Sequence, residues 1–346
     1  MLILTARDVA GLLTMDDVFT AVREALATHV QGHSVTPPRH ALHLPRTATE
    51  VLVMPAAAHE EAMAVKTWHR IDGGTAPGRP ADALPSTGAS VLLLDPTLGQ
   101  EVLLDGSLLT DLRTGALSGV AAEQLAPPGS ARLGVIGAGL QARTQITALA
   151  HALPELERVR VWSRTPQRLH AFVAGVQAEL AGSGRELEVT ATGDAREATD
   201  GADVVVAATT ARSAVFEDAW LRDAALVCGV GSHDPEAAEI PAETVARAQV
   251  VVVDTLRGGL DGAGDVAGPV AAGLLRREDV VELGSLLTGA APAPTATGLR
   301  VFKSVGFAGL DLAVARSLAR RALDQGVGQR IDLHGLARSE ESPRHE

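Results

Sequence analysis

The sequence predicts an α/β protein in which a doubly wound parallel sheet is inserted into a second, α+β domain. Three observations lead to this prediction. Short apolar runs alternate with helical stretches from about residue 127 to residue 302, a pattern typical of a parallel sheet covered by helices on both faces. A glycine-rich turn directly follows the first of these runs. The residues before and after this region form strand-like pieces flanked by helices instead.

Length, charge and cysteine content limit the class of protein. The 346 residues exceed one small core and suit two domains. No apolar run reaches the ~18–20 residues that span a membrane, and charge at Arg7 and Asp8 makes the start a poor signal peptide. The single cysteine, Cys228, suits a reducing compartment. No basic block offsets the net charge of −12, so we expect no nucleic-acid partner. Together with the single cysteine and the short apolar runs, this predicts a cytoplasmic protein without a membrane partner.

The first third of the chain predicts a helix-flanked, mostly antiparallel sheet. Residues 5–30 predict two helices, because a threonine is twice followed by an aspartate at the spacing of a capping box: Thr5 and Asp8, then Thr14 and Asp17. The strand-like pieces that follow are residues 50–55, 62–69, 89–95 and 101–106. A Gly/Pro/Ala-rich loop at 72–88 is of a length that is often functional. Residues 110–126 predict a helix that leads into the next region.

The region that begins after "PPGS" (127–130) contains the strongest motif. Gly137, Gly139 and Ala142 fit the pattern G-x-G-x-x-A, directly after an apolar strand and at the start of a helix. This is the context of a Rossmann dinucleotide-binding turn. The first glycine permits the tight turn, and the second lets the backbone approach a pyrophosphate at the positive end of the helix. We expect the cofactor contacts to come from Gly137, Gly139, Leu140, Gln141 and Ala142.

The end of the next strand predicts which nicotinamide cofactor is preferred. NAD-specific sites usually have an acidic residue there, which binds the ribose hydroxyls. This chain has Ser163, Arg164 and Thr165 instead, which suit a 2′-phosphate. We therefore expect NADP(H) to be preferred over NAD(H). Thr209 and Thr210 end another strand at the carboxyl edge, where ligands bind in such sheets, and are further candidate cofactor contacts.

Three basic residues outside this region form a candidate anion site. Only two of the thirty basic residues are lysines, and Lys66 is one of them. Taken singly, Arg39, Lys66 and Arg113 would each more often be surface charges. Arg113 lies among small residues, which predicts close packing and a carboxylate partner from the protein or a substrate. A lysine, unlike an arginine, can give up a proton near neutral pH. Strand alternation puts Trp68 on the same face as Lys66, either as a pocket wall or as core.

Several motifs in the right order resemble the ornithine cyclodeaminase/mu-crystallin family of nicotinamide-dependent enzymes. They cover most of the chain: "PPRHAL", "VMPA", "AVKTW", "LTDLRTGALSGVAAEQLA", "VIGAGLQA", "VGSHDPEAAEI", "VVVDT" and "FKSVG". The resemblance implies that Arg39, Lys66 and Arg113 bind the substrate carboxylate and that the lysine is a candidate acid/base. It also implies a homodimer. Lys303 falls in a segment near the cofactor, although a hinge lysine paired with an acid is an equal alternative.

The same resemblance implies the domain organisation. Residues 1–126 and 303–333 would form a substrate-binding and dimerisation domain, with the Rossmann domain inserted between them as residues 127–302. This division agrees with the changes of pattern seen in the sequence itself. Residues 334–346 are expected to be a flexible tail.

One segment departs from the family's cyclodeaminases. When "GVGSHDPEAAEI" is aligned on Pro235 and Glu239, His233 stands where those enzymes have an aspartate, and Asp234 follows one place later. Both are candidate catalytic residues. We expect reduction of a cyclic imine acid, Δ1-pyrroline-2-carboxylate or Δ1-piperideine-2-carboxylate, to proline or pipecolate. The alternatives are ornithine cyclodeamination, alanine-dehydrogenase-like reductive amination, and a non-catalytic binding protein. The eleven histidines have no metal-ligand spacing, so no metal is expected.

Overall fold

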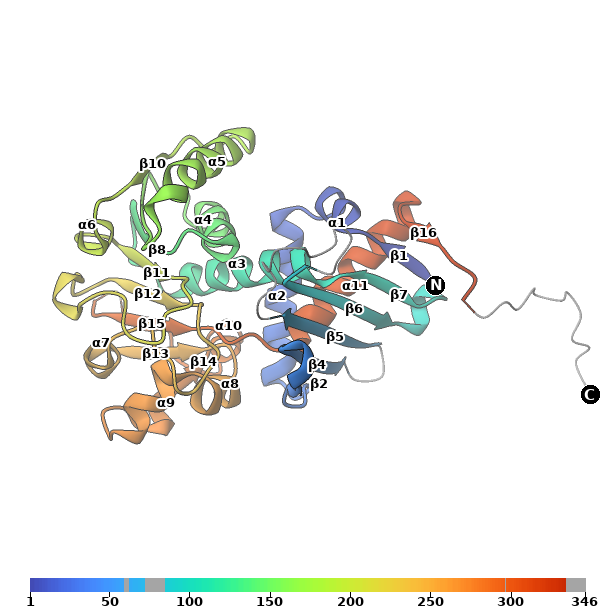
Figure 1. Ribbon diagram of the computed structural model, residues 1–346. Coiled ribbons are helices and arrows are strands. Elements are labelled where there is room, and N and C mark those ends of the chain that lie inside the picture. The colour runs from blue at the N-terminus through green and yellow to red at the C-terminus, as the bar shows by residue number, and fades with distance from the viewer. Residues whose placement is uncertain (59–61, 72–84, 296, 334–346) are drawn as a thin grey trace, which may run out of the picture.

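The computed structural model describes residues 1–58, 62–71, 85–295 and 297–333, and its strands form two sheets that lie side by side (Figure 1). Most of the predicted loop 72–88 and the whole predicted tail 334–346 lie outside the described residues. The mixed α/β fold with a parallel sheet that the sequence predicts is confirmed.

The first sheet and its helices come from the two ends of the chain. Both predicted capping boxes are present, and Thr5 and Thr14 are the N-cap residues of the two N-terminal helices. The elements of this part are β1 (Leu2–Leu4), α1 (Ala6–Leu12), α2 (Met15–Val30), β2 (Ser34–Val35), β3 (His40–Leu44), β4 (Thr49–Ala58), β5 (Ala62–Ile71), β6 (Thr87–Leu94), β7 (Val102–Asp105), α3 (Gly106–Leu125), α11 (Ala308–Gln325) and β16 (Gln329–Arg330).

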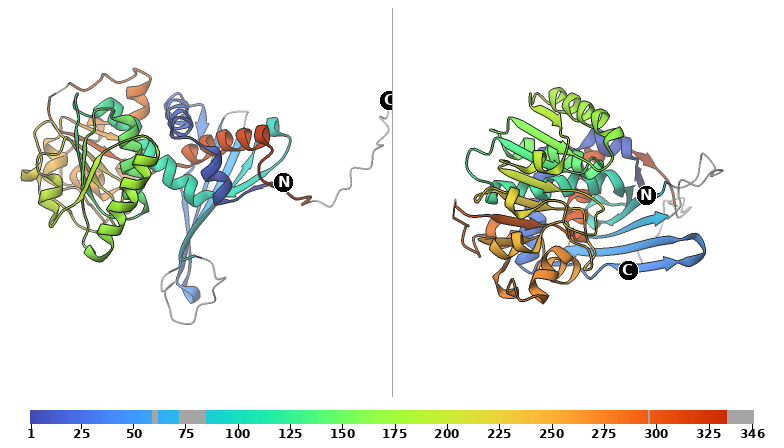
Figure 2. Two further views of the ribbon diagram at one scale, coloured as in Figure 1. Left: turned by 90° about the horizontal axis from the view of Figure 1, so that it is seen from above. Right: turned by 60° about the vertical axis from the view of Figure 1, so that its left-hand side comes forward.

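The strands of the first sheet follow the order β16-β1-β7-β6-β5-β4-β2, with β3 paired to β4. All of these pairs are antiparallel except β1 with β7. Alternate residues of β4 and β5 are buried, and α11 packs against β4, β5 and β6. Helix α2 in turn packs against α11 and α3. The helices therefore cover one face of this sheet, and Figure 2 shows α11 running along it.

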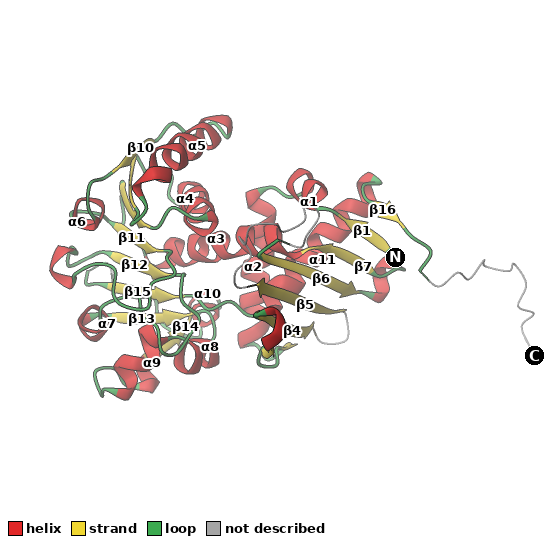
Figure 3. Cartoon of the chain, viewed as in Figure 1, coloured by secondary structure: helices red, strands yellow, loops and turns green. Residues whose placement is uncertain are grey.

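The second sheet is entirely parallel, as expected for runs that are buried on both faces. Helices lie on both of its sides in Figures 2 and 3. Its elements are β8 (Arg132–Ile136), α4 (Leu140–Ala152), β9 (Arg158–Trp162), α5 (Leu169–Gly182), β10 (Glu188–Ala191), α6 (Ala195–Thr199), β11 (Val204–Ala207), β12 (Leu226–Gly229), α7 (Ala242–Arg247), β13 (Val250–Val253), α8 (Leu256–Gly262), α9 (Gly264–Ala271), β14 (Val280–Glu282), α10 (Leu283–Leu287) and β15 (Arg300–Lys303).

The order of this sheet, β10-β9-β8-β11-β12-β15-β13-β14, contains a topological switch point. The chain runs from β8 through β9 to β10 on one side, and then returns to β11 on the other side of β8. In such sheets, ligands bind outside the carboxyl ends of the strands at the point of reversal. The loops after β8 and β11 therefore mark the expected cofactor crevice.

The chain passes between the two sheets twice, from α3 into β8 and from β15 into α11. Helix α3 also packs along α4, where a Cβ atom added to Gly115 would lie only 2.5 Å from the carbonyl oxygen of Thr144. We propose that the two sheets are the cores of two domains, divided close to the sequence-based boundaries. Lys303 belongs to the second sheet as the last residue of β15, an interior strand. Within the described residues, no helix is long and apolar enough to cross a membrane.

Candidate functional site

The glycine turn after β8 has the geometry that a pyrophosphate requires. Gly137 has a φ of +119°, and a Cβ atom there would lie 2.3 Å from the carbonyl oxygen of Ala208, so only glycine fits. Gly139 begins α4 without a side-chain cap, and a Cβ atom there would meet nothing within 4 Å. The free N–H groups of α4 thus face open space at the switch point, which suits a bound anion.

The other predicted cofactor residues surround this turn in different ways. Leu140 is 72% exposed, whereas Ala142 lies on the buried face of α4. The Gln141 amide donates a 2.6 Å hydrogen bond to Asp111 of α3, so it also joins the two halves of the molecule. Ser163 is half-buried at the end of β9, and Arg164 and Thr165, which follow it, are exposed. Thr209 and Thr210 follow β11 at the switch point, with Thr210 exposed.

A buried carboxylate organises two of the three predicted basic residues. Asp311 of α11 lies 2.7 Å from Lys66 Nζ through Oδ2 and 3.1 Å from Arg113 Nε through Oδ1. The exposed fractions are only 3% for the Lys66 side chain and 1% for that of Asp311. Thr110 adds a 3.4 Å hydrogen bond from Lys66. Asp311 was not singled out from the sequence, although a carboxylate inside the apolar segment "FAGLDLAVA" was an available signal.

The charges of this cluster shift one another's protonation. Burial lowers the pKa of Lys66 to about 8, an effect that Asp311 opposes and Arg113 and Arg39 reinforce. For Asp311, burial favours the neutral form, but the positive charges of Lys66 and Arg113 outweigh it and lower the pKa of the carboxyl. Lys66 can therefore lose or gain a proton near neutral pH, which an arginine in its place could not do.

Arg39 meets the same cluster through the loop that follows β15. One terminal nitrogen of its guanidinium donates to the carbonyl oxygens of Val305 and Gly306, both at 3.1 Å. Gly306 has a φ of +74°, and a Cβ atom there would lie 2.6 Å from the Arg113 guanidinium. Asp254, after β13, accepts hydrogen bonds from the backbone N–H groups of Val305 and Gly306 at 2.9 and 2.5 Å. The loop 304–306 is thus held between both arginines.

Two cations share the carboxylate of Asp311, and a third lies nearby. Lys66 and Arg113 both pair with Asp311, and Arg39 acts on the same group of charges. Asp254 and Asp111 add negative charge beside Arg39 and Arg113, although Asp254 uses its Oδ2 to accept backbone N–H groups. A substrate carboxylate could bind beside these cations, because arginine offers it a planar pair of donors.

The two candidate catalytic residues after β12, His233 and Asp234, have different surroundings. The His233 side chain is exposed, yet desolvation and the positive charge of Arg39 lower its pKa, so it lies within the field of the cation cluster. Asp234 instead forms a 2.7 Å ion pair with Arg212, and the two side chains are 40% and 63% exposed. Its other oxygen accepts the N–H of Glu236. These contacts give no support to a catalytic role for Asp234, because both of its carboxylate oxygens bind groups near the protein surface.

Lys303 lies beneath the cofactor edge and not upon it. Its Nζ is 2.7 Å from Oδ2 of Asp265, and both side chains are fully buried. This is the pairing with an acid that the sequence left open, and it gives no support to direct contact between Lys303 and the cofactor. Trp68 is half-buried on the Lys66 side of β5 and packs partly against the core. Among the described residues, no group of three or more His, Cys, Asp or Glu side chains could hold a metal ion.

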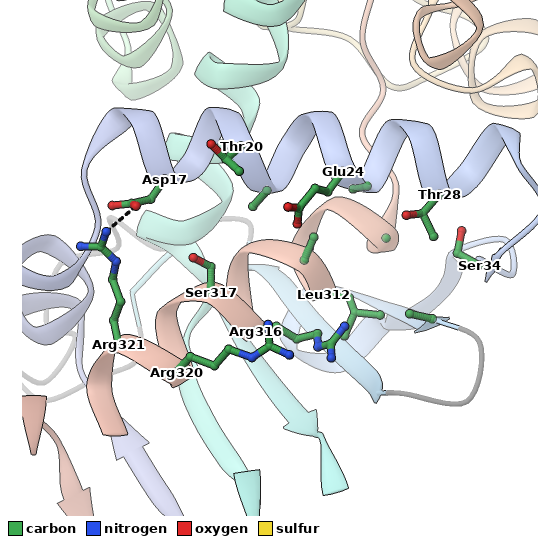
Figure 4. Close-up of a pocket in the computed structure, with 15 residues that line it drawn as sticks. Asp17, Thr20, Glu24, Thr28, Ser34, Leu312, Arg316, Ser317, Arg320 and Arg321 are labelled. Carbon is green, nitrogen blue, oxygen red and sulfur yellow. Dashed lines mark hydrogen bonds and ion pairs between the residues drawn. The ribbon is translucent and has the colours of Figure 1, made fainter. Parts of the chain in front are cut away.

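A separate groove of about 360 Å³ lies between α2 and α11 (Figure 4). Acidic residues of α2, such as Asp17 and Glu24, face Arg316, Arg320 and Arg321 of α11 across it. None of the predicted site residues lines this groove. We therefore place the candidate active site at the glycine turn and the cation cluster.

Comparisons with known proteins identify the family of this chain. The family model described as ornithine cyclodeaminase/mu-crystallin family matches residues 1–326. A Δ1-pyrroline-2-carboxylate reductase of Bacillus cereus is 33% identical over 337 residues, which are 96% of this chain and 100% of the relative.

Two solved structures resemble the whole chain. The Δ1-pyrroline-2-carboxylate reductase of Thermococcus litoralis in complex with NADH and L-proline has a TM-score of 0.87 and 32% identity, covering 96% of this chain and 100% of that one. An archaeal alanine dehydrogenase dimer with bound NAD has a TM-score of 0.85 and 28% identity, covering 96% and 99%. On the match over residues 1–326 and the identity across nearly its full length, the chain belongs to the ornithine cyclodeaminase/mu-crystallin family.

Proposed function

We propose that this protein is a nicotinamide-dependent reductase of a cyclic imine acid, with Δ1-pyrroline-2-carboxylate or Δ1-piperideine-2-carboxylate as substrate and proline or pipecolate as product. The observation that carries the proposal is the cation cluster of Arg39, Lys66 and Arg113, in which Lys66 is buried and has a pKa of about 8. The relatives named for reduction of pyrroline-2-carboxylate support the choice of substrate class.

The reaction needs a hydride at the imine carbon and a proton at the imine nitrogen. The bound nicotinamide supplies the hydride. Arg39 and Arg113 bind the substrate carboxylate, and Asp311 keeps the Arg113 guanidinium in place through Nε. Lys66 donates the proton to the nitrogen, since its lowered pKa leaves it protonated at pH 7 but ready to lose the proton. Desolvation and the charge of Arg39 lower the pKa of His233, so its imidazole is neutral at pH 7 and one ring nitrogen can accept a hydrogen bond.

The alternatives make different demands on this site. Cyclodeamination of ornithine needs a group that manages the distal amine, and Asp234 is paired with Arg212 at the surface. Reductive amination of a 2-oxo acid would use the same carboxylate clamp, and the likeness to an alanine dehydrogenase keeps it as a second candidate. A purely non-catalytic binding protein would not require a buried lysine with a pKa near 8.

We also propose that NADP(H) is preferred over NAD(H). Arg164 follows β9 in an exposed position and has no ion-pair partner among the residues that the structure describes. Ser163 and Thr165 flank it with hydroxyl groups, and no carboxylate stands in this short segment to repel a 2′-phosphate.

The uncovered face of the first sheet suits a homodimer. Several of its residues are apolar; Met63 is exposed and the others are half-buried, which is unusual for a face in contact with water. They are Val51, Val53, Met63, Val65, Leu92 and Leu103. We propose that two copies pack through this face. The dimeric alanine dehydrogenase supports a dimer, and the choice of face rests on the apolar residues alone. The cytoplasm stays the proposed location, because the single cysteine, Cys228, is buried and free.

The substrate proposal is tested by one set of assays. Oxidation of NADPH and NADH is followed with each cyclic imine, and separately with pyruvate plus ammonia. Proline formation from ornithine is followed with catalytic NAD. We expect kcat/KM for a cyclic imine to exceed that for pyruvate plus ammonia by at least ~100-fold. Proline and ammonia from ornithine without net NADH would contradict the proposal, and faster turnover of pyruvate would favour the second candidate.

The role of Lys66 is tested by substitution and by pH. Lys66→Arg should keep cofactor affinity but lower kcat by about 10²–10⁴, because the guanidinium holds its proton. In the unchanged protein, kcat/KM should fall as pH rises through about 8, since only the protonated lysine can donate. Asp234→Asn is the control and should stay within about twofold, as is usual for an exposed surface residue. Near-normal turnover of Lys66→Arg would reduce the lysine to an electrostatic anchor.

The cofactor preference is measured as the ratio of kcat/KM for NADPH and NADH. We expect NADPH to be favoured and Arg164→Ala to lose roughly tenfold for NADPH alone, about the contribution of one charge-assisted hydrogen bond. Arg168→Ala, in the adjacent exposed turn, is the comparison variant. A clear advantage for NADH in the unchanged protein would contradict the preference.

The dimer proposal is tested by sedimentation over a range of concentrations. Met63→Glu places a charge on the uncovered face of the first sheet and should raise the dimer dissociation constant by at least ~10-fold. Leu274→Glu changes a leucine outside that sheet that is 50% exposed, against 42% for Met63, and should leave the dimer intact. A monomer in the unchanged protein at micromolar concentration, or equal effects of both variants, would contradict the assignment of this face.

A further inference from the structure

Glu239 is a buried carboxylate that ties together two loops at the carboxyl edge of the second sheet. Its Oε1 accepts a 2.7 Å hydrogen bond from the N–H of Thr209, in the loop after β11. Its Oε2 accepts from the N–H groups of Gly231 at 2.7 Å and Ser232 at 3.1 Å, in the loop after β12. One side chain therefore sets the positions of loops that follow two neighbouring strands.

The approach of these loops depends on a glycine. A Cβ atom on Gly231 would lie 2.0 Å from the carbonyl oxygen of Thr209 and 2.4 Å from Oε2 of Glu239. Both distances are far below any contact that a real side chain tolerates. The close packing of the two loops around the carboxylate is therefore a built feature of the chain.

A second buried layer holds Glu239 itself. Oδ1 of Asp265 accepts the N–H groups of Glu239 and Ile240 at 2.6 and 2.8 Å, and its Oδ2 pairs with Lys303. The side chains of Glu239, Asp265 and Lys303 are all fully buried. Buried charges are costly unless pairing is complete, so this layer fixes Glu239 from behind. Burial raises the pKa of Glu239, while Lys303 and the Thr209 N–H oppose that shift.

Both loops carry residues of the candidate site. Ser232 directly precedes His233, which lies close enough to Arg39 for that charge to lower the imidazole pKa. Thr209 directly follows Ala208, whose carbonyl oxygen packs against Gly137 of the cofactor turn. A displacement of the Glu239 carboxylate would thus reach the substrate side through His233 and the cofactor side through Thr209.

We propose that Glu239 is a positioning residue, backed by the Asp265–Lys303 pair, which holds His233 and the Thr209 loop in register with the cofactor and the substrate carboxylate clamp. The kinetic part of this inference rests on the proposed function, whereas its cofactor-binding part does not. Glu239 makes its contacts with the backbone of the loops, so it acts on the reaction through other residues.

The test is a double-mutant cycle with a matched control. Glu239→Gln has the same shape, but its single carbonyl oxygen cannot accept from both loops, so an NH₂ group must face at least one N–H donor. We expect kcat to fall by about 10²-fold, the effect of a misplacement near 1 Å. The dissociation constant for NADH, measured by fluorescence, should rise about tenfold. Glu236→Gln, which removes an 85% exposed carboxylate from the same segment, should change neither quantity beyond about twofold.

The cycle is completed with His233→Ala. If Glu239 acts through His233, the double variant should lose little more kcat than the more severe single variant, because the two changes remove the same interaction. Losses that multiply would overturn the link to His233. Glu239→Gln behaving like Glu236→Gln would overturn the proposal as a whole.

Two further measurements keep the outcome decisive. If Glu239→Gln does not fold by circular dichroism, Glu239→Asp keeps the negative charge beside the Lys303 pair but shortens the reach, and the same losses are expected. If the unchanged protein binds NADH but reduces no cyclic imine, the proposed function fails on its own. Positioning is then judged by NADH affinity, and an unchanged dissociation constant in both Glu239 variants overturns it.

Discussion

The site depends first on one buried carboxylate. Asp311 lies between Lys66 and Arg113, and thereby joins α11 near the end of the chain to β5 and α3 near its beginning. If it were removed, two cations would remain buried without a partner, a situation that typically costs about 3–5 kcal/mol. Two cations share its single negative charge, which is the setting that we propose for a substrate carboxylate. The same residue therefore ties α11 to the first sheet and sets the charge around the proposed carboxylate site.

The second sheet uses the same physical device in a different way. There the buried carboxylates of Glu239, Asp254 and Asp265 mostly accept backbone N–H groups and so fix loops at the carboxyl edge. Beside the first sheet, the charges of Lys66, Arg113 and Asp311 are arranged around side chains that we propose to touch the substrate. Buried charge thus fixes loops in one sheet and forms the proposed carboxylate site in the other, and the loop 304–306 is where the two arrangements meet.

The fold and the candidate basic residues could be predicted from local patterns, whereas the partners of these residues could not. The glycine turn, the capping threonines and Lys66 each have a signal within a few residues of sequence. Asp311 pairs with Arg113 across 198 positions, and no local pattern states which distant acid a buried arginine will meet. Asp234 and His233 are neighbours in sequence, yet Asp234 pairs with Arg212 whereas His233 lies near Arg39. The sequence does not state how the turn directs each side chain. The placement of Lys303 likewise depends on a fully buried acid 38 residues earlier in the chain, Asp265.

The second chain crossing has a mechanical consequence. The segment from β15 to α11 connects the two sheets, and along it Arg39 binds two carbonyl oxygens, Asp254 binds two N–H groups, and Gly306 packs against Arg113. A hinge motion between the two sheets would bend this segment and displace both arginines at once. Binding of an anion by the two arginines would then depend on the angle between the sheets, so that loosening the anion would itself favour release.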